Sequence, residues 1–281
     1  MEKIQLGIRL HDVSGATLEE KTEHAKCQGF SCVHLALSKV MGDVPCGSGA
    51  LTPGFAMYVK RLFEDAGLDI AVLGCYQNLA HPDEAALQKI LENYKAHIRF
   101  AALLGCGVVG TETGAPNAAY QYEPACRSEE VLERLIQNLR QVVAYAEQMG
   151  VIIAIEPVAK HIVYSARRAR QVLDEIASPN LQIILDPVNL LDESNYREQD
   201  AVFEEALELL GEDVAVIHLK DYVVEQEGLR AVAAGEGQMD YRSILAFVER
   251  QKPYIQATLE NTTPDNAVFA RMFIEEQIKN H

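Results

Sequence analysis

The sequence is poor in basic residues. It contains 25 lysines and arginines against 41 aspartates and glutamates, so its formal net charge is −16. A surface that binds nucleic acid must attract the phosphate backbone, and an excess of acidic groups repels it. Nucleic acid is therefore not an expected partner. A negative total still permits one local basic pocket, so the composition does not exclude a small anionic substrate.

Two other features are missing. None of the six cysteines belongs to a C-x-x-C pair, and most of them lie in apolar or strand-like surroundings, which indicates reduced thiols. No apolar segment is long enough for a signal peptide or a membrane span, since Met1 is followed by a charged pair and a short strand-like run. We expect a cytoplasmic protein without a membrane partner.

The sequence also has no Ser/Gly-rich linker and no break in composition. Short runs rich in β-branched residues alternate with longer stretches of helical periodicity along the whole chain. The eight expected strands cover residues 5–10, 32–37, 69–76, 107–112, 151–157, 181–187, 214–220 and 254–260. The fifth and sixth of these are almost continuously apolar, as parallel strands covered on both faces are.

Eight consecutive β/α units favour a closed (β/α)8 barrel, the TIM barrel, over a doubly wound open sheet. We expect a single barrel domain over residues 1–281. Two longer segments, 38–54 and 221–240, follow the second and seventh expected strands. Barrel enzymes place their substrate loops after strand carboxyl ends, so we expect both segments at the mouth.

Four of the expected strands end on a potential metal ligand: Glu156, Asp186, His218 and Glu260. Taken alone, each acid could be a helix cap or a solvated loop acid, and His218 could be a core imidazole bonded to a backbone carbonyl. In a barrel, however, the strand ends converge, and burial of three acids together is costly unless a cation compensates them. One imidazole and three carboxylates suit one divalent ion, Mn²⁺, Mg²⁺ or Co²⁺, and zinc is not excluded.

Short motifs follow one another at these strand ends. They are Tyr76-Gln77-Asn78-Leu79-Ala80-His81-Pro82, Ile155-Glu156-Pro157, Leu185-Asp186-Pro187-Val188-Asn189, Ile217-His218-Leu219-Lys220-Asp221, Gly235-Glu236-Gly237 with Asp240, and Leu259-Glu260-Asn261. In this order the chain resembles the xylose isomerase-like superfamily of sugar phosphate isomerases and epimerases, whose barrel is shared with endonuclease IV. The resemblance covers nearly the whole chain.

The resemblance implies a metal-dependent isomerase or epimerase of carbohydrate metabolism, with a small sugar or sugar phosphate as substrate. It assigns the metal to Glu156, Asp186, His218 and Glu260, and gives both glutamates a second role as acid and base. The chemistry agrees, because a cation bridging the carbonyl and hydroxyl oxygens stabilises the enediolate that forms when the α-proton leaves. Two flanking carboxylates can remove that proton and return one. Members of the superfamily often form homo-oligomers.

Five further residues are candidates for substrate contacts: Lys220, His81, Glu112, Asn189 and Glu236. Lys220 could point into the mouth or form an ion pair on the rim, and Glu236 could be a solvated turn acid. His81 and Glu112 follow the third and fourth strands. Asn189 stands where sugar epimerases of the superfamily often have a histidine, which argues against a simple transfer of their substrate specificity.

Three alternative functions stay open. A lyase that dehydrates an inosose or a dehydroshikimate-like acid would use the same metal and base. An endonuclease IV-like repair nuclease would need a histidine-rich three-zinc cluster, whereas this chain has Asn189 and Gly228-Leu229-Arg230 at positions where that enzyme carries ligands. A non-catalytic sugar-binding protein would have no need of two flanking carboxylates.

Overall fold

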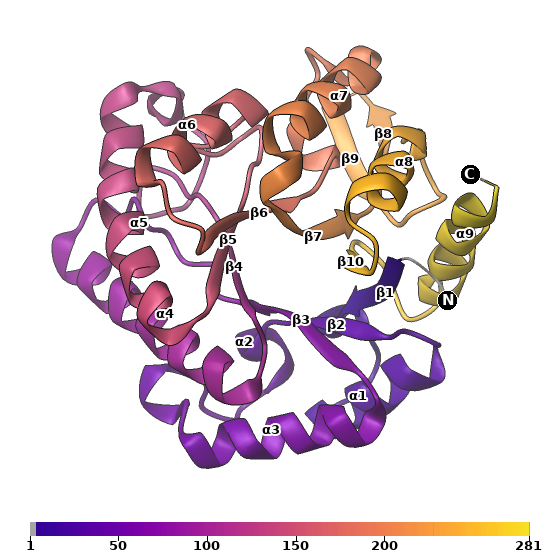
Figure 1. Ribbon diagram of the computed structural model, residues 1–281, viewed down its shortest axis with the longest axis horizontal. Helices are drawn as coiled ribbons and strands as arrows, with labels where there is room; N and C mark the ends of the chain where they lie inside the picture. Colours follow the sequence, from indigo (N-terminus) through magenta and orange to yellow (C-terminus); the bar gives the residue numbers. More distant parts are fainter. Residues whose placement is uncertain (1–3, 227, 281) are drawn as a thin grey trace.

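The computed structural model describes residues 4–226 and 228–280. Eight parallel strands close into a barrel in the order β1-β10-β7-β6-β5-β4-β3-β2, which confirms the expected TIM barrel (Figure 1). The strands are β1 (Ile4–Arg9), β2 (Cys32–Leu35), β3 (Asp69–Gly74), β4 (Val108–Glu112), β5 (Ile152–Glu156), β6 (Leu181–Leu185), β7 (Val214–Leu219) and β10 (Ile255–Leu259). Closure comes from β1 and β10, which pair from Ile4↔Ile255 to Ile8↔Leu259.

The helices surround the barrel (Figure 1). They are α1 (Leu18–Cys27), α2 (Leu37–Val40), α3 (Pro53–Ala66), α4 (Glu84–Leu104), α5 (Glu129–Met149), α6 (Ala166–Ile176), α7 (Gln199–Leu210), α8 (Arg242–Gln251) and α9 (Ala267–Lys279). Local chemistry sets their ends. The Ser128 hydroxyl accepts a hydrogen bond from the Val131 N–H at the start of α5, and Gly150 ends that helix in the left-handed conformation.

Side chains alternate between the two faces of each strand, and this alternation divides the core in two. The larger apolar cluster lies between strands and helices. A smaller one fills the barrel and includes Cys32, Val72, Ala154, Ile184 and Val216. The residue two positions after each inner-layer residue also points inward and lies at the mouth of the barrel. The strand register therefore determines which side chains face the mouth.

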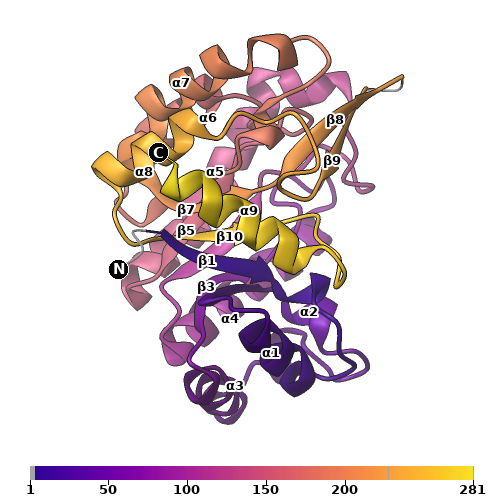
Figure 2. The ribbon, with the colours of Figure 1, turned by 90° about the vertical axis from the view of Figure 1, so that its right-hand side faces the viewer.

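The segment after the seventh barrel strand forms a structure that the sequence did not indicate. β8 (Asp221–Glu225) and β9 (Gly228–Val232) pair as an antiparallel hairpin, which extends away from the barrel (Figure 2). The segment after β2 contains α2 and a short 3-10 turn, Ser48–Ala50. All six cysteines are free, as expected. No helix in the described ranges is long and apolar enough to cross a membrane.

Packing inside the barrel leaves no room at Gly110. A Cβ added there would lie 2.5 Å from Val72 Cγ1 and 2.8 Å from Ile184 Cδ1. We expect Gly110→Ala to destabilise the protein by about 1–3 kcal/mol, because the inner layer must move to admit the methyl group. Urea unfolding followed by circular dichroism measures the change.

The matched control is Gly107→Ala, since a Cβ at Gly107 meets nothing within 4 Å. Both substitutions reduce the entropy of the unfolded chain alike, so the difference between them isolates the packing effect. Equal unfolding midpoints for the two variants would contradict this account of the barrel interior.

Candidate metal centre and active site

Four side chains converge at the carboxyl ends of the barrel strands. Glu156 ends β5, His218 lies near the end of β7, and Asp186 and Glu260 directly follow β6 and β10. All four are buried, and one ligand atom from each lies within 4.8 Å of the others. They meet because each occupies an inward position on its strand. The structure thus brings together the four residues that the sequence singled out.

His218 is central to this cluster. Its Nδ1 lies 3.4 Å from Glu156 Oε2 and 3.2 Å from Glu260 Oε1. The side chain is 0% exposed, and its other ring nitrogen, Nε2, has no hydrogen-bond partner. A buried polar group without a partner is costly, and a bound cation would provide one. The donor set of one imidazole and three carboxylates could therefore hold a divalent metal ion.

Cations of the chain partly balance the three acids. Lys220 Nζ lies 2.8 Å from Asp186 Oδ2 and donates a hydrogen bond of 3.2 Å to Glu260 Oε2. Arg9 Nη1 lies 3.6 Å from Glu260 Oε2, and its guanidinium also pairs with Asp12. Lys220 therefore points into the mouth of the barrel, which was one of the two placements expected for it.

The pKa values reflect this crowding. Burial raises the pKa of Asp186 to about 6, against the opposing effect of Lys220. Burial lowers the pKa of His218, but Glu260 and Glu156 outweigh it and bring the pKa to about 9. Burial also raises the pKa of Glu260, and His218, Lys220 and Arg9 reverse this and hold it below its ordinary value. Without a bound cation, His218 is therefore protonated at neutral pH and carries a positive charge within the cluster.

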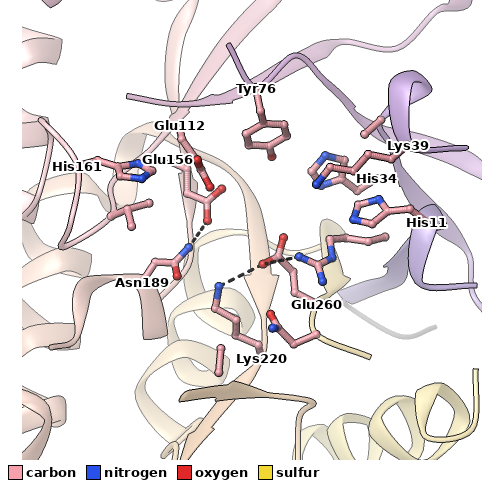
Figure 3. Close-up of a pocket in the computed structure, with 15 residues that line it drawn as sticks. His11, His34, Lys39, Tyr76, Glu112, Glu156, His161, Asn189, Lys220 and Glu260 are labelled. Atoms are coloured by element: carbon pink, nitrogen blue, oxygen red, sulfur yellow. Dashed lines mark hydrogen bonds and ion pairs between the residues drawn. The ribbon is translucent and has the colours of Figure 1, made fainter. Parts of the chain in front are cut away.

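One wall of the cavity carries Glu112, Glu156, His161 and Asn189 (Figure 3). Tyr120 donates a hydrogen bond of 3.2 Å to Glu112 Oε2, and His161 Nδ1 lies 3.8 Å from the same oxygen. Burial is the main reason why the pKa of Glu112 is raised. Asn189 Nδ2 donates a hydrogen bond of 2.6 Å to Glu156 Oε1, so Asn189 orients that glutamate.

The opposite wall contains His11, His34 and Lys39, with Tyr76 between the walls (Figure 3). The His34 ring stacks between His218 and Tyr76, at centroid distances of 5.3 and 5.5 Å. Both of its nitrogens lack a hydrogen-bond partner, and burial holds its pKa well below the ordinary value. His34, His218 and Glu260 form a second group whose donor atoms lie within 4.8 Å of one another.

Sequence reasoning overlooked several lining residues: Arg9, His34, Lys39, Tyr76 and His161. The signal for two of them was present. Arg9 and His34 are direct partners in the β1–β2 register. His34 lies two residues after Cys32 of the inner layer, and Arg9 lies two residues after Gly7, which pairs with Cys32. Applying the two-residue alternation to the first two strands would have placed both at the mouth.

Two candidates for substrate contacts do not line the cavity. The His81 ring accepts a hydrogen bond from the Asp83 N–H at the start of α4, and its carbonyl accepts one from Arg134. Glu236 accepts a hydrogen bond of 2.9 Å from Asn266 Nδ2, just before α9. In the structure the loops turn these side chains toward the starts of helices and away from the cavity. Lys220, Glu112 and Asn189 do line the cavity.

Comparison with known proteins shows the family. Residues 25–274 match the family described as the xylose isomerase-like TIM barrel. The chain belongs to this family. The expected resemblance is thereby confirmed, and this xylose isomerase-like barrel has no match among curated proteins.

Solved structures of similar fold cover nearly the whole xylose isomerase-like barrel. A D-tagatose 3-epimerase-like protein has a TM-score of 0.76 at 19% identity, covering 98% of this chain and 97% of that one. The 3-keto-D-glucoside 4-epimerase YcjR from E. coli has a TM-score of 0.73 at 15% identity, covering 98% and 100%. The IolI protein with a zinc atom also has a TM-score of 0.73 at 15% identity, covering 98% of each chain.

The cluster predicts stoichiometric metal binding. We expect the purified protein, loaded with Mn²⁺ or Zn²⁺ and dialysed, to retain about one ion per chain. The Glu156→Gln, His218→Ala double variant should retain little, because it loses two of the four donors. Elemental analysis measures the content, and circular dichroism shows whether the variant is folded.

Glu112→Gln is the matched control. It makes the same Glu-to-Gln change in the same cavity, but Glu112 is not one of the four clustered residues. This control should keep its metal. Equal metal content in the wild type and the double variant would refute the site.

Proposed function

We propose that the protein is a divalent-metal-dependent isomerase or epimerase of a small sugar or sugar phosphate, with Glu156 and Glu260 as its acid and base. One observation carries the proposal: the two carboxylates, at the ends of β5 and β10, both approach the same His218 ring nitrogen, to 3.4 Å and 3.2 Å. Two such groups at one cavity can take a proton from a carbon atom and return one to it or to its neighbour.

When bound, a divalent ion supplies Lewis-acid stabilisation of the negative charge that proton removal leaves on the substrate oxygens. Glu156, Asp186, His218 and Glu260 would hold it. His218, Lys220 and Arg9 together hold the pKa of Glu260 low, so this glutamate is ionised at neutral pH, as a metal ligand or a proton acceptor must be. Asn189 fixes the orientation of Glu156 through its 2.6 Å hydrogen bond.

The cavity suits a substrate of this kind. Its volume is about 300 Å³, and charged and hydrogen-bonding side chains form most of its lining. A volume at the low end of the range for ligand pockets fits a small polar molecule. Tyr76 and His34 have buried polar atoms without partners there, which sugar hydroxyls could satisfy. The epimerases among the similar folds support the same reading.

Dehydration is a second candidate, and Glu112 favours it. Burial raises the pKa of Glu112, and the side chain lines the same cavity as Glu156. A protonated carboxyl at that place could protonate a departing hydroxyl, so that the shared enediolate loses water instead of regaining a proton at carbon.

Deuterium exchange tests the proposal. Incubated with ketoses and ketose phosphates in deuterated water, the metal-loaded protein should incorporate deuterium at the carbon next to the carbonyl and form an isomer or epimer. Glu156→Gln and Glu260→Gln should each lower product formation by roughly 10²- to 10⁴-fold, the usual contribution of an acid or base. Mass spectrometry and NMR measure both, and a dehydrated product would identify the lyase.

Glu236→Gln serves as the control because Glu236 lies outside the cavity and bonds to Asn266. It should leave the rate unchanged. Product formation that survives the loss of either Glu156 or Glu260 would overturn the assignment of two proton-transfer groups.

A further inference from the structure

A second cavity adjoins the one at the metal centre. Its volume is about 260 Å³, and it shares Ala36, Lys39 and Tyr76 with the main cavity. It lies between the segment after β2 and the end of β3, and residues on α4 close its far side. We call it the side cavity. A substrate whose reacting carbons lie at the metal centre could extend into it past Lys39 and Tyr76.

The two cavities differ in charge. Glu112, Glu156 and Glu260 line the main cavity, whereas no aspartate or glutamate lines the side cavity. A wall that carries a lysine and no acid attracts anions, and Lys39 is exposed where an anion from solution can reach it.

The polar groups of the side cavity are available to a ligand. The side chains of Ser38, Lys39 and Gln77 line it and form no hydrogen bond or ion pair with any residue in the described ranges. A hydroxyl, an ammonium and a carboxamide all offer donors. His97 is buried and committed to the Asn93 carbonyl at 2.9 Å, so it closes the cavity without adding charge.

Lys39 stands at the junction of the two cavities. Burial and then Arg9 lower the pKa of His11 to about 4, and Lys39 adds to this lowering. On the facing wall, burial raises the pKa of Glu112 and Lys39 is among the charges that oppose the rise. Lys39 lines both cavities, and Figure 3 shows it reaching from its helix toward the pocket.

We propose that the side cavity binds an anionic substituent of the substrate, a phosphate or a carboxylate, with Lys39 as its counter-ion and Ser38 and Gln77 as hydrogen-bond donors. The substituent lies at the end of the molecule away from the metal centre. This rests on the proposed function, because that function places the reacting carbons between Glu156 and Glu260. The substrate is then an anionic sugar derivative rather than a free sugar.

Two variants test the side cavity. Lys39→Met removes the counter-ion. Gly47→Leu fills the space: Gly47 lines the side cavity, has an ordinary extended backbone with φ −68° and ψ 169°, and a Cβ there meets nothing within 4 Å. The matched controls are Lys89→Met, an exposed lysine on α4, and Gly49→Leu, where a Cβ also meets nothing within 4 Å and no cavity is lined.

The kinetic test compares ketoses with their phosphates and with the corresponding sugar acids, using deuterium exchange by the metal-loaded protein. For the wild type, kcat/KM should be at least about tenfold higher for one anionic series than for the neutral parents, as expected for one charge-assisted contact. Lys39→Met and Gly47→Leu should abolish this preference by lowering kcat/KM much more for the anionic series than for the neutral parents, while the controls keep it. Phosphate or carboxylate is identified by which series gains.

A loss in Lys39→Met that is equal for neutral and anionic substrates would overturn the proposal, as would a wild type that prefers the neutral parents. Calorimetry with inorganic phosphate separates this inference from the proposed function. Phosphate should bind the metal-loaded wild type more tightly than either side-cavity variant. Lys39-dependent phosphate binding with no exchange on any sugar would support the side cavity and refute the isomerase. Equal phosphate affinity in the wild type and Lys39→Met would refute the side cavity alone.

Discussion

Three carboxylates share a small buried volume at the mouth of this barrel, and the surrounding side chains are arranged around their repulsion. Two like charges 4 Å apart cost about 4 kcal/mol at an effective dielectric constant of about 20. Three such pairs would rival the whole stability of an ordinary domain, roughly 5–15 kcal/mol. Lys220 neutralises one charge through Asp186 and Glu260, while Arg9 is shared with Asp12. About two negative charges of the cluster then remain uncompensated. A protonated His218 compensates one of them, and a divalent cation would compensate both.

The closed barrel is what makes this concentration of charge predictable. Parallel strands with a two-residue period bring every second side chain to the same axis, so residues at the ends of four strands must meet if the barrel closes. The fold and the cluster of Glu156, Asp186, His218 and Glu260 could therefore be predicted from the sequence. The same rule applies to Arg9 and His34, which are paired near the carboxyl ends of β1 and β2 and both line the cavity.

Loop side chains were not predictable in this way. Glu112 is the last residue of β4, whereas His81 and Glu236 lie in loops where the chain has left the strand register. Hydrogen bonds to Asp83 and Asn266 turn these two side chains elsewhere. The β8–β9 hairpin and the side cavity have the same origin. Both arise from segments inserted after strand ends, where pairing and packing depend on contacts between residues far apart in sequence. The net charge of the chain does not predict the charge of a single cavity either. The total is −16, yet the side cavity is lined by Lys39 and by no acid.

The position of Glu112 bears on which reaction the proposed chemistry completes. Removal of the α-proton needs only the metal cluster, and both an epimerase and a lyase begin with it. The outcomes diverge at the next step, when either a proton returns to carbon or a hydroxyl leaves with one. Glu156 and Glu112 occupy paired positions on β5 and β4 and therefore lie side by side. In the proposed chemistry Glu156 transfers a proton to or from carbon, and Glu112 could protonate the leaving oxygen. The Tyr120 hydroxyl donates to Glu112, which stabilises its ionised form, whereas burial stabilises the neutral acid. The balance between that hydrogen bond and burial thus sets whether Glu112 offers a proton to a leaving group or only accepts a bond from a substrate hydroxyl.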